Sequence, residues 1–185
     1  MVAFDGKSFV SRICIVFTRG ESTYALCSGR CATSQAYLVS SDGDALPIGP
    51  VAYKVWDEKV WGMDFSVVRI TENVPVKPWH VRNEPVIGTL SSAQIKEYVG
   101  HSNVAVAGYN EFELIATSEN GARTGFHMIL HRKKGGCHTP VTGDPVTIVV
   151  GGRQHILVGM MVAHVLGEAN RYIAEPMDWF IKEHT

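Results

Sequence analysis

Residues 1–72 carry short runs in which hydrophobic and polar side chains alternate, and this pattern predicts β-strands. Almost no helical spacing of hydrophobic residues occurs in this part of the chain. The region is therefore predicted to be an all-β unit, most simply a small barrel. The expected strands lie at residues 12–19, 22–30, 34–41, 51–61 and 63–70.

Residues 71–86 read TENVPVKPWHVRNEPV, and their three prolines argue against a regular element, so this segment is predicted to be an external connector. A short helix is predicted over 91–99, where a serine cap precedes good helix formers. An amphipathic helix with acidic residues in its first turn is expected over 175–184. Between these helices the predicted strands lie at 103–110, 111–118, 124–132, 145–152, 153–164 and 170–174, with a turn at Asn120.

Together these elements predict an all-β fold class, with two six-stranded antiparallel β-barrels, an inter-barrel linker and a C-terminal helix. The predicted N-terminal barrel spans residues 1–72. The inter-barrel linker is expected at 73–88, and the C-terminal barrel with its terminal helix at 89–185.

The net charge of −1, from 17 Lys and Arg against 18 Asp and Glu, gives no global field that would recruit nucleic acid or an anionic membrane. The four cysteines are predicted to be free thiols. Cys27 and Cys31 lack the second ligand pair that a structural zinc site needs, so no metal and no cofactor is expected. The apolar stretch 156–166 is far shorter than the roughly 20 residues of a membrane helix, so we expect a soluble protein that does not bind membranes by itself.

The sequence GGC at residues 135–137 is the strongest candidate for chemistry. A cysteine after paired glycines sits where the backbone can turn sharply, which exposes the sulfur and lets neighbouring amides converge on one point. This is the local arrangement of a nucleophile beside an oxyanion hole. The same three residues are equally compatible with an ordinary turn, so the motif alone leaves both interpretations open.

Several segments, in their order along the chain, resemble the chymotrypsin-like cysteine proteases of positive-strand RNA viruses, in particular the 3C-type proteases of picornaviruses. The resemblance implies a chymotrypsin-like fold and cleavage of viral polyprotein junctions. It implies Cys137 as nucleophile, Asp64 as the acidic triad member, and Gly135, Gly136 and Cys137 as the oxyanion hole. The segments are AYLVSSD at 36–42, MDFSVVRI at 63–70, GGCHTPV at 135–141, HILVGMMVAH at 155–164 with RYIA at 171–174, and PMDWFIKEH at 176–184.

The departures from this family pattern concern the catalytic positions. No histidine occurs between Met1 and Trp79, and the position of the family's general base falls on Asp42, whose carboxylate is a far weaker base than imidazole. In the substrate pocket, the family's specificity histidine and its threonine partner correspond to Met161 and Arg132, with His164 on the same strand.

Other histidines remain as candidates for a base. His127 and His131 share one face of the strand before the nucleophile turn, and either could line the cleft. His138 would have to fold back onto Cys137, and His80 and His101 are expected to be exposed.

Three functions remain in view. The chain is either a catalytically impaired protease-fold protein kept for binding, or an active cysteine endopeptidase that uses Cys137 with a non-standard base, or an interaction module of a replication complex. The expected partners are viral polyprotein segments, viral RNA and replication-complex proteins, in the host cytoplasm. The candidate RNA-binding residues lie in the linker, where cations flank an aromatic ring; they are Lys77, Trp79, His80 and Arg82.

Overall fold

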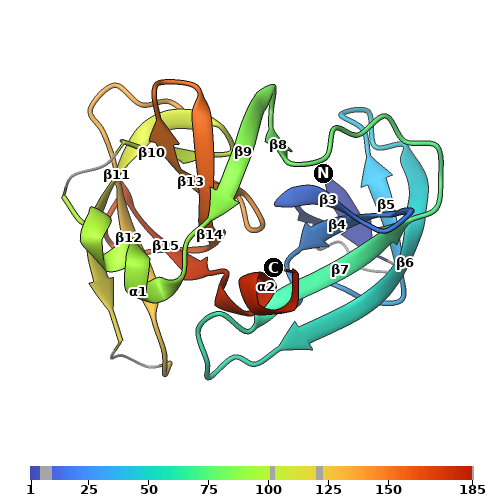
Figure 1. Cartoon of the computed structure of the whole chain (residues 1–185), viewed down its shortest axis with the longest axis horizontal. Helices are drawn as coiled ribbons and strands as arrows, with labels where there is room; N and C mark the ends of the chain where they lie inside the picture. Colours follow the sequence, from blue (N-terminus) through green and yellow to red (C-terminus); the bar gives the residue numbers. More distant parts are fainter. Residues whose placement is uncertain (5–9, 101–102, 120–122, 185) are drawn as a thin grey trace.

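The computed structural model describes residues 1–185 except 5–9, 101–102, 120–122 and 185. Its described strands form two sheets, one in each half of the chain, with a C-terminal helix between them (Figure 1). The all-β, chymotrypsin-like fold class is confirmed. No helix in the described part of the chain is long and apolar enough to cross a membrane.

The first sheet has seven antiparallel strands in the order β2-β1-β5-β6-β7-β4-β3. It curls into a half-barrel, because β2 and β3 at its two ends do not pair with each other in the described residues. The five predicted strands are present, and β1 and β2 are additions that the pattern did not reveal. The bounds are β1 Val2–Phe4, β2 Val10–Ser11, β3 Ile15–Arg19, β4 Ser22–Cys27, β5 Gln35–Val39, β6 Ala45–Trp56 and β7 Asp64–Ile70.

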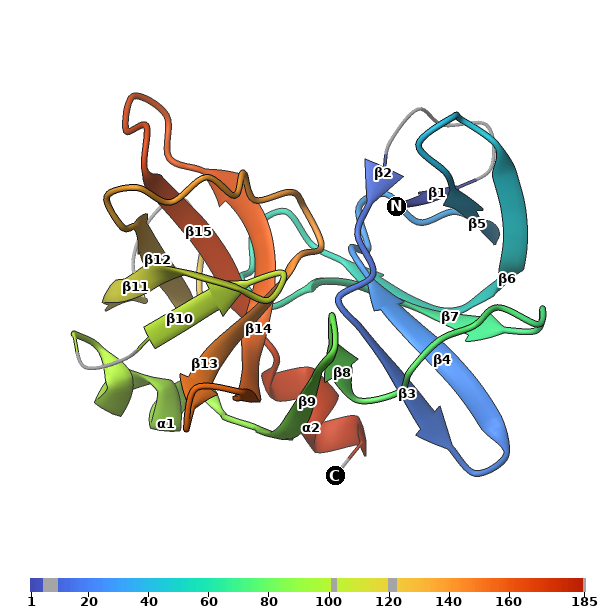
Figure 2. The same ribbon diagram turned by 90° about the horizontal axis from the view of Figure 1, so that it is seen from above.

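The second sheet contains a closed six-stranded barrel. Its strand order is β13-β10-β11-β12-β15-β14-β9-β8, and the extra pairing of β13 with β14 closes the ring (Figure 2). All of the strands predicted after residue 100 are found here. Their bounds are β10 Asn103–Val106, β11 Tyr109–Ser118, β12 His127–Arg132, β13 Pro145–Val150, β14 Gln154–His164 and β15 Arg171–Pro176.

The proline-rich connector is more regular than the sequence predicts. Strands β8 (His80–Val81) and β9 (Glu84–Thr89) form a hairpin there, and β9 pairs in parallel with β14. The expectation of an irregular segment was therefore wrong over these residues. Only Pro85 falls inside a strand, where it faces the two-residue β8 at the sheet margin, a place that tolerates a missing backbone donor.

The predicted helices are present. Ser91 caps α1 (Ser92–Ile95), with its amide donating to the Gln94 side chain at 2.9 Å, and a 3-10 turn η1 (Lys96–Tyr98) follows. The terminal helix α2 spans Asp178–His184. The predicted turn at Asn120 lies outside the described residues.

Three hydrophobic clusters give each barrel a core and join the two. One fills the first half-barrel and another fills the second barrel. The third lies between them, where Phe17 and Phe65 of the first sheet pack with Met160 of β14 and Phe180 of α2. Because this shared cluster fixes the two barrels side by side, residues of both can meet along their boundary.

A glycine lies at a close contact between the two barrels. Gly143, with φ of +93°, lies so near the β2–β3 segment that an added Cβ would stand 2.4 Å from Ser11 Oγ and 2.5 Å from Arg12 O. By contrast, Gly20 has φ of +60° with no atom within 4 Å of the added Cβ.

We expect Gly143→Ala to lower the free energy of unfolding by about 3 kcal/mol or more, because it combines left-handed backbone strain with a collision against backbone. Gly20→Ala is the matched control and should show only the strain, about 1–2 kcal/mol. Denaturant unfolding of both variants measures the difference, and equal losses would contradict a tight inter-barrel contact at Gly143.

Candidate functional site

The carboxylate of Asp64 is buried at the start of β7 and accepts three hydrogen bonds from one turn. Ser28 Oγ donates at 2.9 Å, the Arg30 amide donates at 2.7 Å, and Arg30 Nε donates to the second carboxylate oxygen. Gly29 lets this turn press against the sheet, since an added Cβ would lie 2.2 Å from Val55 O. The turn after β4 is therefore built around Asp64.

In a catalytic triad an imidazole donates to the buried carboxylate, whereas here a guanidinium, that of Arg30, donates to Asp64. This guanidinium lies 4.9 Å from the centre of the Trp56 ring and forms a salt bridge with Asp64. An arginine side chain remains protonated and has no acceptor, so it cannot take a proton from a nucleophile.

The predicted base, Asp42, lies elsewhere. It is exposed in the turn between β5 and β6, where its amide donates to Ser40 Oγ at 3.2 Å. In the described part of the chain, the side chains that hydrogen-bond to Asp64 belong to Ser28 and Arg30, and Asp42 is not among them. The structure thus does not bring Asp42 and Asp64 together.

Cys137 lies exposed in the loop between β12 and β13, with its sulfur 3.6 Å from Gly135 O. The amides of Cys137 and His138 converge on one oxygen, Glu111 Oε2, each at 2.8 Å. Of the three predicted oxyanion residues, only Cys137 contributes an amide to this point, because the Gly136 amide donates to Lys133 O. Two amides do converge as the motif suggested, but they hold a carboxylate of the same chain.

His138 does not fold back onto Cys137. Its Nε2 lies 3.2 Å from Asp144 Oδ2, and its ring stacks on Tyr109 with centroids 4.3 Å apart. Asp144 is fully buried and also accepts the Val141 amide at 2.8 Å. The ring next to the exposed cysteine is thus held by a different carboxylate.

Two of the three predicted pocket residues come together. Met161 and His164 line a cavity of about 80 Å³ with Tyr172 and the loop 140–142. This volume is well below the roughly 300 Å³ at which ordinary ligand pockets begin. Arg132 lies outside it, donating to Asn170 Oδ1 at 3.0 Å and to His138 O at 3.1 Å.

The predicted RNA-binding segment is only partly exposed. Lys77 and Arg82 are exposed, and the Arg82 guanidinium lies 4.3 Å from the centre of the Tyr109 ring. Trp79 packs on the shared core, with its ring 5.9 Å from that of Phe180, and His80 Nδ1 lies 2.6 Å from Pro78 O. Trp79 is therefore not the exposed stacking platform that was expected, and RNA binding at this segment stays a prediction.

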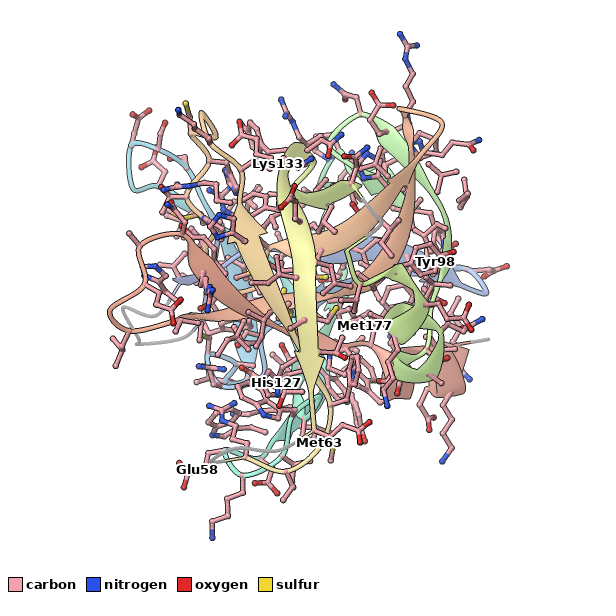
Figure 3. The ribbon with its side chains drawn as sticks, turned by 90° about the vertical axis from the view of Figure 1, so that its left-hand side faces the viewer. Glu58, Met63, Tyr98, His127, Lys133 and Met177 are labelled. Carbon is pink, nitrogen blue, oxygen red and sulfur yellow. The ribbon has the colours of Figure 1, made fainter. Side chains whose placement is uncertain are left out.

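His127 lies at the boundary between the barrels. It is buried, and its ring lies 4.7 Å from that of Trp61 in the turn between β6 and β7. Figure 3 shows His127 at one end of β12, near Met63 of that turn, and Lys133 at the other end of the strand. His127 and the Cys137 loop are thus at opposite ends of β12, while His101 lies outside the described residues.

A third buried carboxylate, that of Glu175 in β15, joins the barrels at this same end. Its Oε2 accepts the Gly62 amide at 3.0 Å, and its Oε1 lies 3.3 Å from Arg123 Nη1. Burial, and then the charge of Asp64, raise the pKa of Glu175 from 4.5 to about 7, although Arg123 and Arg30 act in the opposite direction.

Two residues that define these contacts were not predicted from the sequence. Arg30 and Glu111 carried no motif, and only the position of Ser28–Arg30 directly after a strand could have drawn attention to that turn. All four cysteines are free thiols, and Cys137 alone is exposed. Within the described ranges, no group of three His, Cys, Asp or Glu side chains is placed to hold a metal ion.

The two joined barrels define the class of protein: the chain has the fold of the chymotrypsin-like proteases. Among solved structures it is similar to one described as alpha-lytic protease homolog N4, with a TM-score of 0.60 and 17% identity over 94% of this chain and 89% of that one. A second, a glutamic acid specific serine protease described as using a histidine triad in substrate binding, gives a TM-score of 0.60 and 13% identity over 99% and 94%. At these identities the likeness concerns the fold alone.

No protein-family model matches the chain, and no curated protein sequence does. The solved structures support the chymotrypsin-like protease fold but not the picornaviral 3C type specifically, which stays a prediction.

We expect Glu111→Ala to speed hydrogen exchange of the Cys137 and His138 amides by about tenfold or more. The reason is that two charge-assisted hydrogen bonds, each worth about 1.5–3 kcal/mol, are lost together. Glu113→Ala, two residues along β11, is the control. Unchanged exchange at both amides would show that Glu111 does not fix the loop.

The free energy of unfolding should change with pH, and the shifted pKa of Glu175 sets the direction of that change. The folded-state pKa lies above the unfolded value, so the proton binds more tightly in the folded state. The contribution is fully present below about pH 4.5 and is lost as pH rises through about 7, a loss on the order of 3 kcal/mol. Glu175→Gln should therefore gain stability relative to the wild type across this window.

Comparison of the wild type with Glu175→Gln also separates the titration of Glu175 from the titration of other buried groups. Burial lowers the pKa of His127 and of His155 from 6.5, which gives the opposite trend, a loss of stability as pH falls below about 6.5. Both histidines are present in the wild type and in the variant, so their contributions to the free energy of unfolding cancel in the difference. A difference that stays constant with pH would rule out the titration of Glu175.

Proposed function

We propose that this chain is a catalytically impaired relative of polyprotein-processing cysteine endopeptidases, a pseudoprotease kept for binding. The observation that carries the proposal is the Arg30–Asp64 pair. A positioned general base contributes about 10²–10⁴-fold to a reaction of this kind, and a guanidinium cannot take that part. The neighbouring imidazole of His138 is engaged with Asp144.

The Glu111 carboxylate supports the same proposal. A tetrahedral intermediate needs amide donors at its oxyanion, and losing one donor costs about 10²–10³-fold in rate. Here the two convergent amides donate to Glu111 Oε2. A fixed negative charge at that point repels a second anion, so the convergent amides favour a stable loop over turnover.

The origin and partners of the protein belong to the proposal as well. The order of motifs along the chain supports a viral origin and a place in the host cytoplasm. The partners would be polyprotein segments, replication-complex proteins or viral RNA, and the exposed Lys77 and Arg82 are the cations available to phosphates.

Cleavage assays decide between this proposal and its alternative, an active endopeptidase that uses Cys137 with a non-standard base. We expect neither the wild type nor Cys137→Ala to cleave a peptide library or the parent polyprotein above the buffer background. A cooperative unfolding transition shows that each sample is folded, and alkylation of the wild type but not of Cys137→Ala shows that the thiol is accessible. Cleavage by the wild type that Cys137→Ala abolishes would establish the endopeptidase instead.

A further inference from the structure

A cavity of about 360 Å³ opens on the outer face of the first sheet, beside α2. Figure 1 shows α2 lying against this side of the half-barrel. Four of the eight lining residues are aromatic, two are aliphatic and two are charged. The lining consists of Phe17, Arg19, Tyr24, Ala52, Tyr53, Val67, Trp179 and Glu183.

This cavity continues the face that packs against the rest of the protein. Phe17 and Phe65 are buried there against α2, and Trp179 stacks on Phe65. The helix leaves part of the face open, so Tyr53 remains 55% exposed although its ring lies 5.9 Å from that of Phe65. A concave aromatic surface of this size falls in the range of ligand-binding pockets.

The charges in the lining indicate the chemistry of the occupant. Arg19 and Glu183 are both exposed, and neither has an ion pair among the described residues. They carry opposite signs in one cavity. An occupant that complements this cavity has an apolar centre, a basic group for Glu183 and an acidic group for Arg19.

The shape of the cavity narrows the class of occupant further. The lining residues on the sheet come from four neighbouring strands, β3, β4, β6 and β7, so the cavity lies across the sheet face, and a strand added at the edge strand β3 would not fill it. At about 360 Å³ the cavity holds only a few side chains of an occupant, whereas an amphipathic helix needs a long groove. Polyproline II segments suit aromatic surfaces, because their rings are rigid and their carbonyls are free to accept hydrogen bonds from tyrosine hydroxyls. Tyr24 and Tyr53 supply such hydroxyls here.

We propose that this cavity binds a proline-rich peptide in the polyproline II conformation, with a basic residue at Glu183 and an acidic residue at Arg19. The occupant is a segment of a partner protein. This site lies on the first sheet and α2, and it does not depend on whether Cys137 cleaves peptide bonds.

Binding of a fluorescent peptide tests the proposal. The probe has a proline-rich core with an aspartate at one end and a lysine at the other, and the control peptide has alanine at every proline. We expect the intact protein to bind the probe at least about tenfold more tightly than the control, since the prolines reduce the cost of ordering the peptide. Equal binding of the two peptides would overturn the polyproline II assignment.

Variants on one strand locate the site. Tyr53→Ala should weaken probe binding by about tenfold, as removal of a central aromatic anchor does. Leu46→Ala is the matched control, because Leu46 lies on the same strand β6, is 53% exposed, and is not part of the cavity. Equal effects of the two substitutions, or none from Tyr53→Ala, would overturn the site.

Charge exchange tests the two ends of the peptide. Glu183→Lys should weaken binding of the probe by about threefold, which is the effect expected from the loss of an exposed ion pair. A second peptide, in which glutamate replaces the lysine of the probe, should bind Glu183→Lys as tightly as the probe binds the wild type. The same peptide should bind the wild type more weakly than the probe does. Failure of this exchange, or occupation of the cavity by a second copy of the chain in sedimentation experiments, would overturn the proposed partner.

Discussion

A chain of buried polar contacts links Asp64 in the first barrel to Asp144 in the second and holds the boundary of this protein together. Ser28 donates to Asp64 through its hydroxyl and to Ser11 Oγ through its amide. The residue after Ser11, Arg12, donates its amide to Thr142 O of the second barrel, and its Nε lies 3.4 Å from Asp144 Oδ1. A buried carboxylate costs several kcal/mol unless donors or cations surround it, so the first barrel stabilises Asp144 of the second through Arg12.

The same constraint explains why an arginine is favourable beside Asp64. Asp64 needs donors because it is buried, and Arg30 supplies both an amide and a permanent positive charge. An imidazole would satisfy the same carboxylate and remain able to accept a proton, whereas a guanidinium has no acceptor. Arg30 therefore stabilises the turn, and under the proposed function the same residue leaves Asp64 without an imidazole partner.

The strands could be predicted from the sequence, because β3, β4 and β7 are short runs rich in β-branched and aromatic residues. Their buried residues are consecutive, since neighbouring side chains such as Ile15 and Val16 face two different hydrophobic clusters. The β8–β9 hairpin could not be predicted, since prolines there suggest a loop and the pairing of β9 with β14 depends on a strand far along the chain. Asp64 was assigned as the acidic triad member through the resemblance of its strand to the 3C-type proteases, and that role stays a prediction. Its contact with Arg30 could not be predicted, because Arg30 is 34 residues away and only the folded sheet brings the two together.

The same reasoning explains where a partner can bind. The boundary between the barrels is occupied by the shared hydrophobic cluster and by paired polar groups, with Arg12 beside Asp144 and Glu175 bonded across to Gly62. A ligand entering there would have to displace groups that are already paired, and their desolvation cost would return. The first sheet, by contrast, is a half-barrel whose outer face α2 covers only in part, so Tyr53 remains exposed. Burial of that aromatic surface breaks no internal ion pair, and this makes the sheet face the energetically favourable place for binding.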